Sequence, residues 1–563
     1  MTVKLERIWF YAGLTSLISV IAILIFFSDR GLGFPDEGLH ALLSNPLQEN
    51  RNSLVNYDIL FKYLYDSSGI TLNLIELRLF RLSLVILGSL YLITPVYLLN
   101  KSNINNIISP RLFFVIALLL GFWNYLTWFT RTPSYGSFTF LGIQLFLGSL
   151  LFFQSKYISI PSIRTLIFSI ICLFGFILCW ISKISAIPVL VFILIITSFI
   201  LPKKSIIWYS LFIVIFVAGF ISFYYFYDYI NINLFNNVKD ALFQKSSTHS
   251  LDSQLKNLGT SLVLFFSAFL FGLLLFKKII YIKRKKLILF STLFLILVIL
   301  FILLDFHRSK MTHLNRVNFI GEYLIHRMSM IIILILAFFT GLKLNFNNSK
   351  NNLIGLFIFN LAILASVLGT NSSLLFASIG SIQFLILGWM MILKFEKAIL
   401  ILFIPITFLI FTIPIFFHIP PGQGKWINAT HKYYYGKNKY DYVYLDKETF
   451  LVQSKVKEIL EKDSINYILG YDRLPGFIYL SGYTYTSPGS YLWGNEDIDM
   501  YFRKKFTNPN SLQLILNGKE SQEIMFPYLN KYTLTLKDSV GVYLPHRFKG
   551  STQFYIFKCI KKN

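Results

Sequence analysis

The chain has 563 residues, of which 55% are hydrophobic and only 14% carry charge. Soluble proteins carry roughly 25% charged residues, so this composition excludes an ordinary soluble protein and indicates a membrane protein. Much of the formal net charge of +25 lies in short loops between apolar runs. That distribution is typical of membrane topology, and it argues against a nucleic-acid-binding role.

Apolar runs that are long enough to cross a bilayer recur through the first three quarters of the chain. A helix needs about 20 apolar residues to span the hydrocarbon core. The sequence "WISKISAIP" is interpreted as a turn between two spans, with a kink in one bent helix as the alternative. We therefore expect thirteen transmembrane helices, near residues 8–28, 79–99, 112–129, 137–153, 165–182, 186–201, 206–226, 259–276, 287–305, 324–342, 353–369, 375–393 and 398–417.

Basic segments between the predicted spans indicate the orientation of the chain. The sequences "VKLER", "QSKYISIPSIR", "PKKS" and "KKIIYIKRKK" all fall on one side when the spans alternate. Cytoplasmic loops carry an excess of Lys and Arg, so this side is predicted to be the cytoplasm. An odd number of spans then places the C-terminus outside. We expect a multi-pass protein of the bacterial inner (plasma) membrane, with a cytoplasmic N-terminus and a periplasmic C-terminal domain.

The first predicted external loop, at 29–78, is unusually long and carries an acidic pair. In its sequence "GFPDEGLHALLSNP", Asp36 and Glu37 lie just beyond the first span, and His40 follows Asp36 by one helical turn. A proline followed by two acids is also typical of a solvated helix N-terminus, which is the alternative interpretation. Further on, "NSLVNYDILFKYLYDSSG" has apolar residues at helical spacing and predicts a helix on the membrane surface.

The last part of the chain, 418–563, has no spanning run and many tyrosines. It combines strand-like stretches ("NYILGY", "YTLTL", "QFYIF") with an amphipathic helix, "KETFLVQSKVKEILEK". We therefore predict a transmembrane catalytic domain at 1–417 and a C-terminal α/β extracytoplasmic domain at 418–563. The sequence "YDRLPGFIYLSGYTYTSPGS" predicts a strand, a loop, a short helix and a turn. The tyrosines of "HKYYYGKNKYDYVYL" suit sugar stacking, a membrane-interface belt or a small core.

Several cationic side chains are expected on the same side of the membrane as the acidic pair. Arginine is well suited to bidentate phosphate binding. Arg131 lies in the short turn "TRTPSYG", and Lys183 lies in the turn "SKIS". The predicted loop at 306–323 adds further basic candidates, for which binding of lipid head groups is the alternative. They are Arg308, Lys310, His313 and Arg316.

Other ionisable groups lie at the edges of predicted spans. His326 and Arg327 lie inside or at the start of an apolar run, and an ionisable group at membrane depth is a functional hypothesis by default. The alternative is that Arg327 reaches the interface or neutralises Glu322. Arg78 and Arg81, at the entry to the second span, are interpreted as interfacial anchors.

This layout resembles the C-type glycosyltransferases (GT-C), which use polyprenyl-linked sugars. The resemblance rests on a first membrane helix, then the Asp36–Glu37 pair, an amphipathic external loop, many spans and a C-terminal domain. The group includes protein O-mannosyltransferases and the aminoarabinose transferase of lipid A, and the latter and its relatives are similar in the number of spans. The turn "SKIS" is also similar to an external turn of the family. By contrast, "NYDILFKYL" lacks the His-Pro-Pro stretch that many members have there.

The resemblance implies transfer of a sugar from a polyprenyl-phosphate donor to an extracytoplasmic lipid, glycan or protein. Displacement at an anomeric carbon needs a base near the acceptor hydroxyl and positive charge near the departing phosphate. Asp36 is the candidate base, and Glu37 would orient it or help to hold a divalent cation such as Mg²⁺ or Mn²⁺. The candidates for binding the substrate or the donor phosphate are His40, Arg131, Lys183, Arg308, Arg316 and Arg327.

Two other functions stay open on the sequence alone. An O-antigen ligase or polymerase also joins lipid-linked sugars, although its catalytic arginines would be expected in a large late loop. A flippase or transporter of lipid-linked sugars would line a path through its spans with buried charge. Few charges fall in the middle of the predicted spans.

Overall fold

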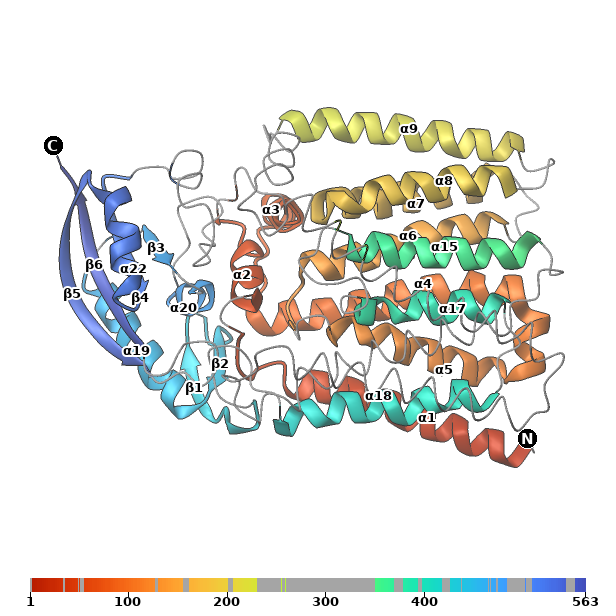
Figure 1. The fold of residues 1–563 in the computed structure, drawn as a ribbon, viewed down its shortest axis with the longest axis horizontal. Helices are drawn as coiled ribbons and strands as arrows, with labels where there is room; N and C mark the ends of the chain where they lie inside the picture. The colour runs from red at the N-terminus through yellow and green to blue at the C-terminus, as the bar shows by residue number, and fades with distance from the viewer. Residues whose placement is uncertain are drawn as a thin grey trace.

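The chain forms a bundle of long helices that run roughly side by side, with a smaller sheet-containing part at one end (Figure 1). This arrangement comes from a computed structural model. The structure describes a few isolated positions and residues 3–33, 36–48, 55–126, 130–154, 162–200, 206–229, 350–368, 378–392, 397–417, 426–436, 438–463, 467–471, 474–482, 509–542 and 552–562.

Among the described residues, four helices are long and apolar enough to cross a membrane by length and composition. They are α1 (Val3–Phe26), α4 (Leu74–Ile107), α6 (Tyr135–Gln154) and α7 (Ser162–Ser182). The chain is therefore mostly helical and consistent with a membrane protein. The other described bundle helices are α5 (Pro110–Gly121), η1 (Phe122–Leu126), η2 (Ile184–Ala186), α8 (Ile187–Ile200), α9 (Ile206–Tyr229), α15 (Lys350–Val367), η5 (Ser378–Ser381), α17 (Ile382–Ile392) and α18 (Lys397–Phe417).

The predicted spans match these helices where the chain is described. The stretch "WISKISAIP" is a break between two helices, because α7 ends at Ser182 and α8 begins at Ile187. Three predicted spans, 259–276, 287–305 and 324–342, lie outside the described residues. The count of thirteen is therefore not confirmed.

Small and polar side chains allow the bundle helices to pack closely. A Cβ atom on Gly142 of α6 would lie 2.6 Å from the carbonyl oxygen of Gly175 on α7, so these two backbones touch at a pair of glycines. The buried amide of Gln144 donates to Gln383 on α17 at 2.8 Å and to Ser89 on α4 at 3.1 Å. These hydrogen bonds link α4, α6 and α17 where water is excluded.

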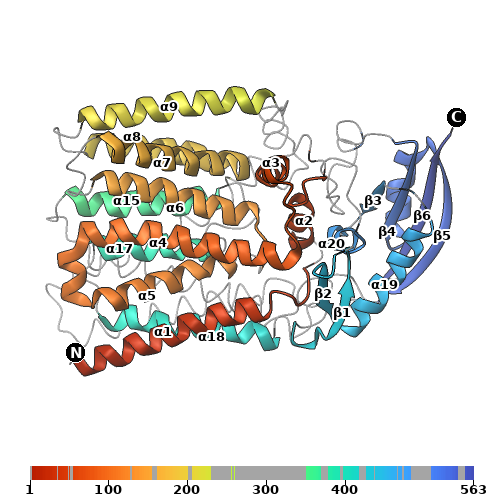
Figure 2. The same cartoon turned by 180° about the vertical axis from the view of Figure 1, so that it is seen from behind.

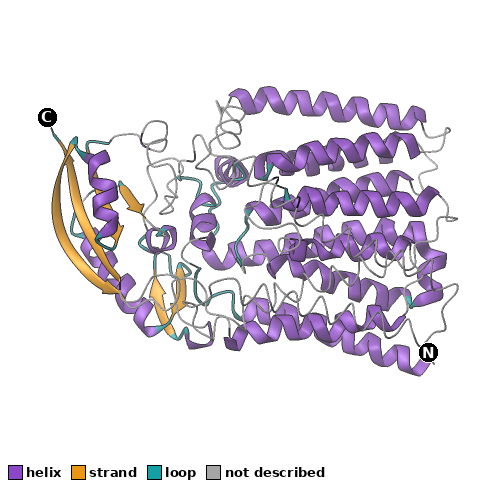
Figure 3. Ribbon diagram, in the orientation of Figure 1, coloured by secondary structure: helices purple, strands orange, loops and turns teal. Residues whose placement is uncertain are grey.

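All the described strands lie in the C-terminal part (Figure 3). A hairpin pairs β1 (His431–Tyr434) with β2 (Tyr442–Leu445). A second sheet has the order β3-β4-β6-β5, with β3 parallel to β4 and the other neighbours antiparallel. The remaining elements are β3 (Ile468–Tyr471), β4 (Ser511–Asn517), β5 (Tyr532–Val542), β6 (Thr552–Lys561), α19 (Lys447–Glu461), α20 (Pro475–Leu480), α22 (Glu520–Met525), η6 (Trp426–Asn428) and η7 (Phe526–Leu529). The strands predicted from "NYILGY", "YTLTL" and "QFYIF", and the helix before them, are confirmed.

The first loop contributes two helices that lie between the bundle and the sheets (Figure 2). These are α2 (Asp36–Leu43) and α3 (Asp58–Ser68). Helix α2 packs against α20, and its buried Ala41 and Leu42 belong to the hydrophobic core of the C-terminal part. Leu43 of the same helix packs in the separate core of the bundle, so α2, which carries the acidic pair, lies at the junction of the two regions.

A glycine at this junction sets the distance between α2 and α20. A Cβ atom on Gly38 would lie 2.3 Å from the backbone of Gly476, closer than any real contact. We expect Gly38→Ala to destabilise the protein by about 1–3 kcal/mol, because backbone must move to make room. Gly136→Ala is the matched control, since the nearest atom to a Cβ there is 3.7 Å away. Thermal unfolding of both variants in detergent tests this, and equal stability of the two would contradict it.

Candidate functional site

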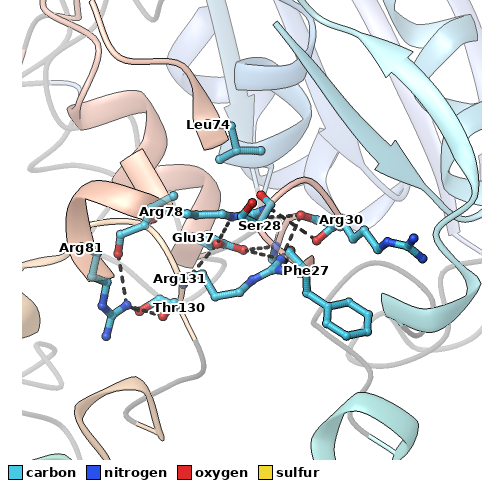
Figure 4. Close-up of polar contacts among 12 residues, drawn as sticks. Phe27, Ser28, Arg30, Glu37, Leu74, Arg78, Arg81, Thr130 and Arg131 are labelled. Atoms are coloured by element: carbon cyan, nitrogen blue, oxygen red, sulfur yellow. Dashed lines mark hydrogen bonds and ion pairs between the residues drawn. The ribbon is translucent and has the colours of Figure 1, made fainter. Parts of the chain in front are cut away.

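The centre of the site is the buried carboxylate of Glu37, in the first turn of α2 (Figure 4). Its Oε1 accepts hydrogen bonds from Nε of Arg78 and from the backbone N–H of Arg131, both at 3.1 Å. Its Oε2 accepts from the backbone N–H of Gly33 at 2.9 Å and lies 3.6 Å from Nη2 of Arg131. Both carboxylate oxygens are therefore bound by N–H groups of the protein.

The same two arginines hold the chain where it leaves α1. Arg78 donates to the carbonyl of Ser28 at 2.6 Å and also to that of Gly31. Arg131 donates to the carbonyls of Phe27 at 2.6 Å and Gly31 at 2.9 Å. The end of a helix leaves carbonyl groups without intrahelical partners, and here guanidinium groups bind the carbonyls that follow it. The position of the acidic pair is thus tied to the end of α1.

A third arginine, Arg81, lies one turn further along α4 and is also buried. It donates to the carbonyl and hydroxyl of Thr130 and to the carbonyl of Asn124, and its guanidinium lies 4.5 Å from the ring centroid of Tyr125. Arg131 lies in the same way 4.1 Å from the ring of Trp426. Among the described residues, Glu37 is the one carboxylate within 4 Å of any of the three arginines. The cluster therefore has an excess of positive charge.

A very small cavity, with room for about one water molecule, lies beside these arginines. Arg78 and Arg131 line its polar side. The Nε of Arg131 is buried and has no hydrogen-bond partner within the described part of the chain. The apolar side is lined by Leu24, Leu79, Leu82 and Tyr125. The lining therefore combines cationic donors with aliphatic side chains, and a group larger than water would fit only if these side chains moved apart.

The electrostatics of Glu37 argue against proton transfer by this residue. Burial alone would raise the pKa of its carboxyl group, but the charges of Arg78 and Arg131 outweigh burial and lower the pKa to about 2. Burial and Arg78 lower the pKa of Arg131 to about 9, so its guanidinium is still charged at neutral pH. Glu37 is a permanent anion at physiological pH. It positions the arginines, and its two occupied oxygens make it unsuited to bind a metal ion.

Asp36 and His40, four residues apart in α2, both lie near Tyr135 at the start of α6. Nδ1 of His40 is 2.7 Å from the hydroxyl of Tyr57, and its ring centroid is 5.6 Å from that of Tyr135. Tyr135 is also close enough to Asp36 to interact with its charge. Asp36 is only partly buried, in contrast to Glu37. Of the two carboxylates, Asp36 is therefore the better placed to meet a substrate.

The buried His40 should make the protein sensitive to mild acid. Burial lowers the pKa of His40 from 6.5 to about 3, so between these values the unfolded chain binds a proton that the folded chain does not. Stability is therefore complete above pH 6.5 and falls as the pH drops. The buried Glu37 adds a further loss of stability only at lower pH, between its ordinary pKa of 4.5 and its pKa of about 2 in the folded protein. We expect a loss of about 2 kcal/mol between pH 6.5 and 5, and His40→Gln should remove most of it. Thermal unfolding of both proteins across this range is the measurement.

The structure brings four of the sequence-predicted site residues to this junction: Asp36, Glu37, His40 and Arg131. Lys183 is not part of the cluster, because its Nζ donates to the carbonyl of Ser366 at 2.6 Å, near the end of α15. The remaining candidates lie outside the described residues; they are Arg308, Lys310, His313, Arg316, His326 and Arg327, together with Glu322. No group of three His, Cys, Asp or Glu side chains suited to a metal ion occurs among the described residues.

The interpretation of Arg78 and Arg81 as interfacial anchors was wrong. Their exposed fractions are 3% and 1%, because the three-residue spacing places both on the face of α4 that packs inside the protein. That spacing, directly after an acidic loop, was the signal available in the sequence. No family model, curated protein or solved structure matches this chain.

Proposed function

We propose that this chain is an integral-membrane glycosyltransferase of the C-type. It would transfer a sugar from a polyprenyl-phosphate donor to an extracytoplasmic acceptor. The observation that carries the proposal is the buried arginine cluster beside α1 and α4, where Arg78 and Arg131 lie next to aliphatic side chains. Guanidinium groups are suited to the phosphate of such a donor, and the aliphatic lining is suited to the first part of its prenyl chain.

The proposed reaction uses the two sides of α2 differently. Asp36 removes the proton from the acceptor hydroxyl, and the resulting oxygen attacks the anomeric carbon of the donor sugar. The bond from that carbon to the phosphate oxygen breaks, and the lipid phosphate leaves with the electron pair. Arg78 and Arg131 stabilise the charge that develops on the phosphate. Glu37 holds the arginines in place and takes no part in proton transfer.

The proposal includes the finer topology predicted from the sequence: thirteen spans, a cytoplasmic N-terminus and residues 418–563 in the periplasm of a bacterium. The long apolar helices and the basic inner segments support it. A topology reporter fused at Asn563 should give an extracytoplasmic signal. A cytoplasmic signal would contradict both the span count and the predicted side of the site.

Donor binding by the two arginines can be measured directly on purified protein. We expect a long-chain polyprenyl phosphate to bind, and the uncharged polyprenol to bind far more weakly. Arg131→Gln should weaken phosphate binding roughly 10- to 100-fold, because a hydrogen bond to a charged group contributes about 1.5–3 kcal/mol. Lys183→Gln is the control, since this buried cation does not line the cavity. Equal losses in the two variants, or equal binding of alcohol and phosphate, would contradict the site.

A further inference from the structure

The β1–β2 hairpin presents two different faces. Its inward face is apolar and buried, with Tyr433, Val443 and Leu445. Side chains alternate along a strand, so the intervening residues share the opposite face. That outer face carries three tyrosines whose rings form a ladder, with centroid distances of 6.1 Å from Tyr434 to Tyr442 and 5.8 Å from Tyr442 to Tyr444.

Two cations lie on this ladder and extend it to the end of α1. Nζ of Lys432 is 4.0 Å from the ring centroid of Tyr442. The guanidinium of Arg30 is 6.0 Å from the ring centroid of Tyr444 and 4.7 Å from that of Phe26. Phe26 is the last residue of α1 and is 60% exposed. We call these six residues the tyrosine belt: Phe26, Arg30, Lys432, Tyr434, Tyr442 and Tyr444.

Backbone hydrogen bonds place the belt next to the membrane end of α1. The N–H of Tyr444 donates to the carbonyl of Asp29 at 2.7 Å, and the N–H of Gly31 donates to the carbonyl of Tyr444 at 2.7 Å. Asp29 is only three residues beyond the end of α1, a distance of about 10 Å at most. The polar interface on each side of a bilayer is roughly 5–8 Å thick. If α1 spans the membrane, the belt therefore begins at the level of the lipid head groups.

We propose that the tyrosine belt is a membrane-contact surface that binds anionic phospholipid head groups. Tyrosine is enriched at membrane interfaces because its ring is apolar and its hydroxyl is polar. Lys432 supplies positive charge that complements anionic lipid, and Arg30 adds to it, although its Nε lies 3.9 Å from the carboxylate of Asp29. The belt is continuous with the exposed end of a spanning helix, so the bilayer is its nearest apolar neighbour. This inference depends on α1 crossing the membrane and is independent of the transferase reaction.

Contact with the bilayer would also fix the height of the site. The hairpin belongs to the same core as α20, and α20 packs against α2. Lipid contact at the belt thereby holds the sheet-containing part, and with it the acidic pair, at a constant distance from the head groups.

A spin label on the outer face of the hairpin tests the proposal in the full-length protein. Tyr434→Cys is labelled with a nitroxide after reconstitution into vesicles of phosphatidylcholine and phosphatidylglycerol. The three native cysteines are buried, and the unmodified protein measures their background. Lys432→Cys provides a second position on the same face. Leu536→Cys is the matched control, because Leu536 is 52% exposed on β5, the sheet edge far from the bundle.

We expect nickel chelated to lipid head groups to broaden the spectra of labels at 434 and 432 but not at 536. A water-soluble nickel complex should act mainly on the label at 536. Replacing phosphatidylglycerol by phosphatidylcholine should reduce the broadening at 434. The proposal would be overturned if the labels at 434 and 432 were as accessible to the water-soluble nickel complex as the label at 536. Protection of both labels by added oligosaccharide would also overturn it, because it would identify a sugar platform instead.

Discussion

Glu37→Gln should lower the free energy of unfolding by about 3–5 kcal/mol, although it replaces only one carboxylate oxygen by an amide nitrogen. The substitution keeps the shape of the residue and removes its charge, which leaves Arg78 and Arg131 buried without a counter-ion. Removing one partner of a buried ion pair is destabilising by about this amount, because the remaining charge has lost its hydration. Denaturant unfolding of the purified protein in detergent is the measurement.

Asp36→Asn is the matched control for that experiment. It removes the same charge from the neighbouring residue, which is only partly buried and lies on a different side of α2. We expect it to change the free energy of unfolding far less than Glu37→Gln does. Equal destabilisation by the two substitutions would show that the buried cluster depends on the total negative charge of α2 rather than on Glu37.

The second large effect is on catalysis. On the proposed function, Asp36→Asn should lower turnover by roughly 10²–10⁴-fold, which is the usual contribution of a placed general base. Binding of the polyprenyl phosphate should be unchanged, because the phosphate contacts arginines rather than Asp36. The assay follows sugar transfer from the donor lipid by purified protein, with donor binding measured on the same samples.

The outcomes of this experiment separate the possible roles of Asp36. Near-normal sugar transfer by Asp36→Asn would support the alternative interpretation, in which Asp36 is a solvated acid at a helix N-terminus. If the wild-type protein binds the donor but transfers no sugar to any acceptor tested, the flippase interpretation is favoured. Loss of donor binding in Asp36→Asn would contradict the division of roles between the two sides of α2.

Local patterns in the sequence predicted the secondary structure well. Long apolar runs predicted α1, α4, α6 and α7, because a run of about 20 apolar residues can be identified from the sequence without knowing what it packs against. Alternation predicted β5 and β6, and helical spacing predicted α19. The break at "WISKISAIP" was also correct. Each of these features depends on residues that are neighbours in the chain.

The candidate site was predicted only in part, because its members come from distant segments. The acidic pair and Arg131 were proposed from their types and positions, with Asp36 as the candidate base, but the sequence did not predict that Glu37 is buried. Only packing shows that one is buried against two arginines while the other is partly exposed. Arg78 was misjudged for the same reason, since its helix face cannot be known before its neighbours are placed.

By itself, the sequence determined that this chain is largely helical, with apolar helices long enough to cross a membrane, a sheet-containing C-terminal part and an acidic pair beyond its first long apolar helix. Tertiary structure alone decided which member of that pair is buried and joined α2 to α20 in one core. The physical reason is that hydrophobicity and backbone periodicity are local, whereas the burial of a charge is not. Glu37 can be buried only because Arg78 and Arg131, 41 and 94 residues away, supply its hydrogen bonds.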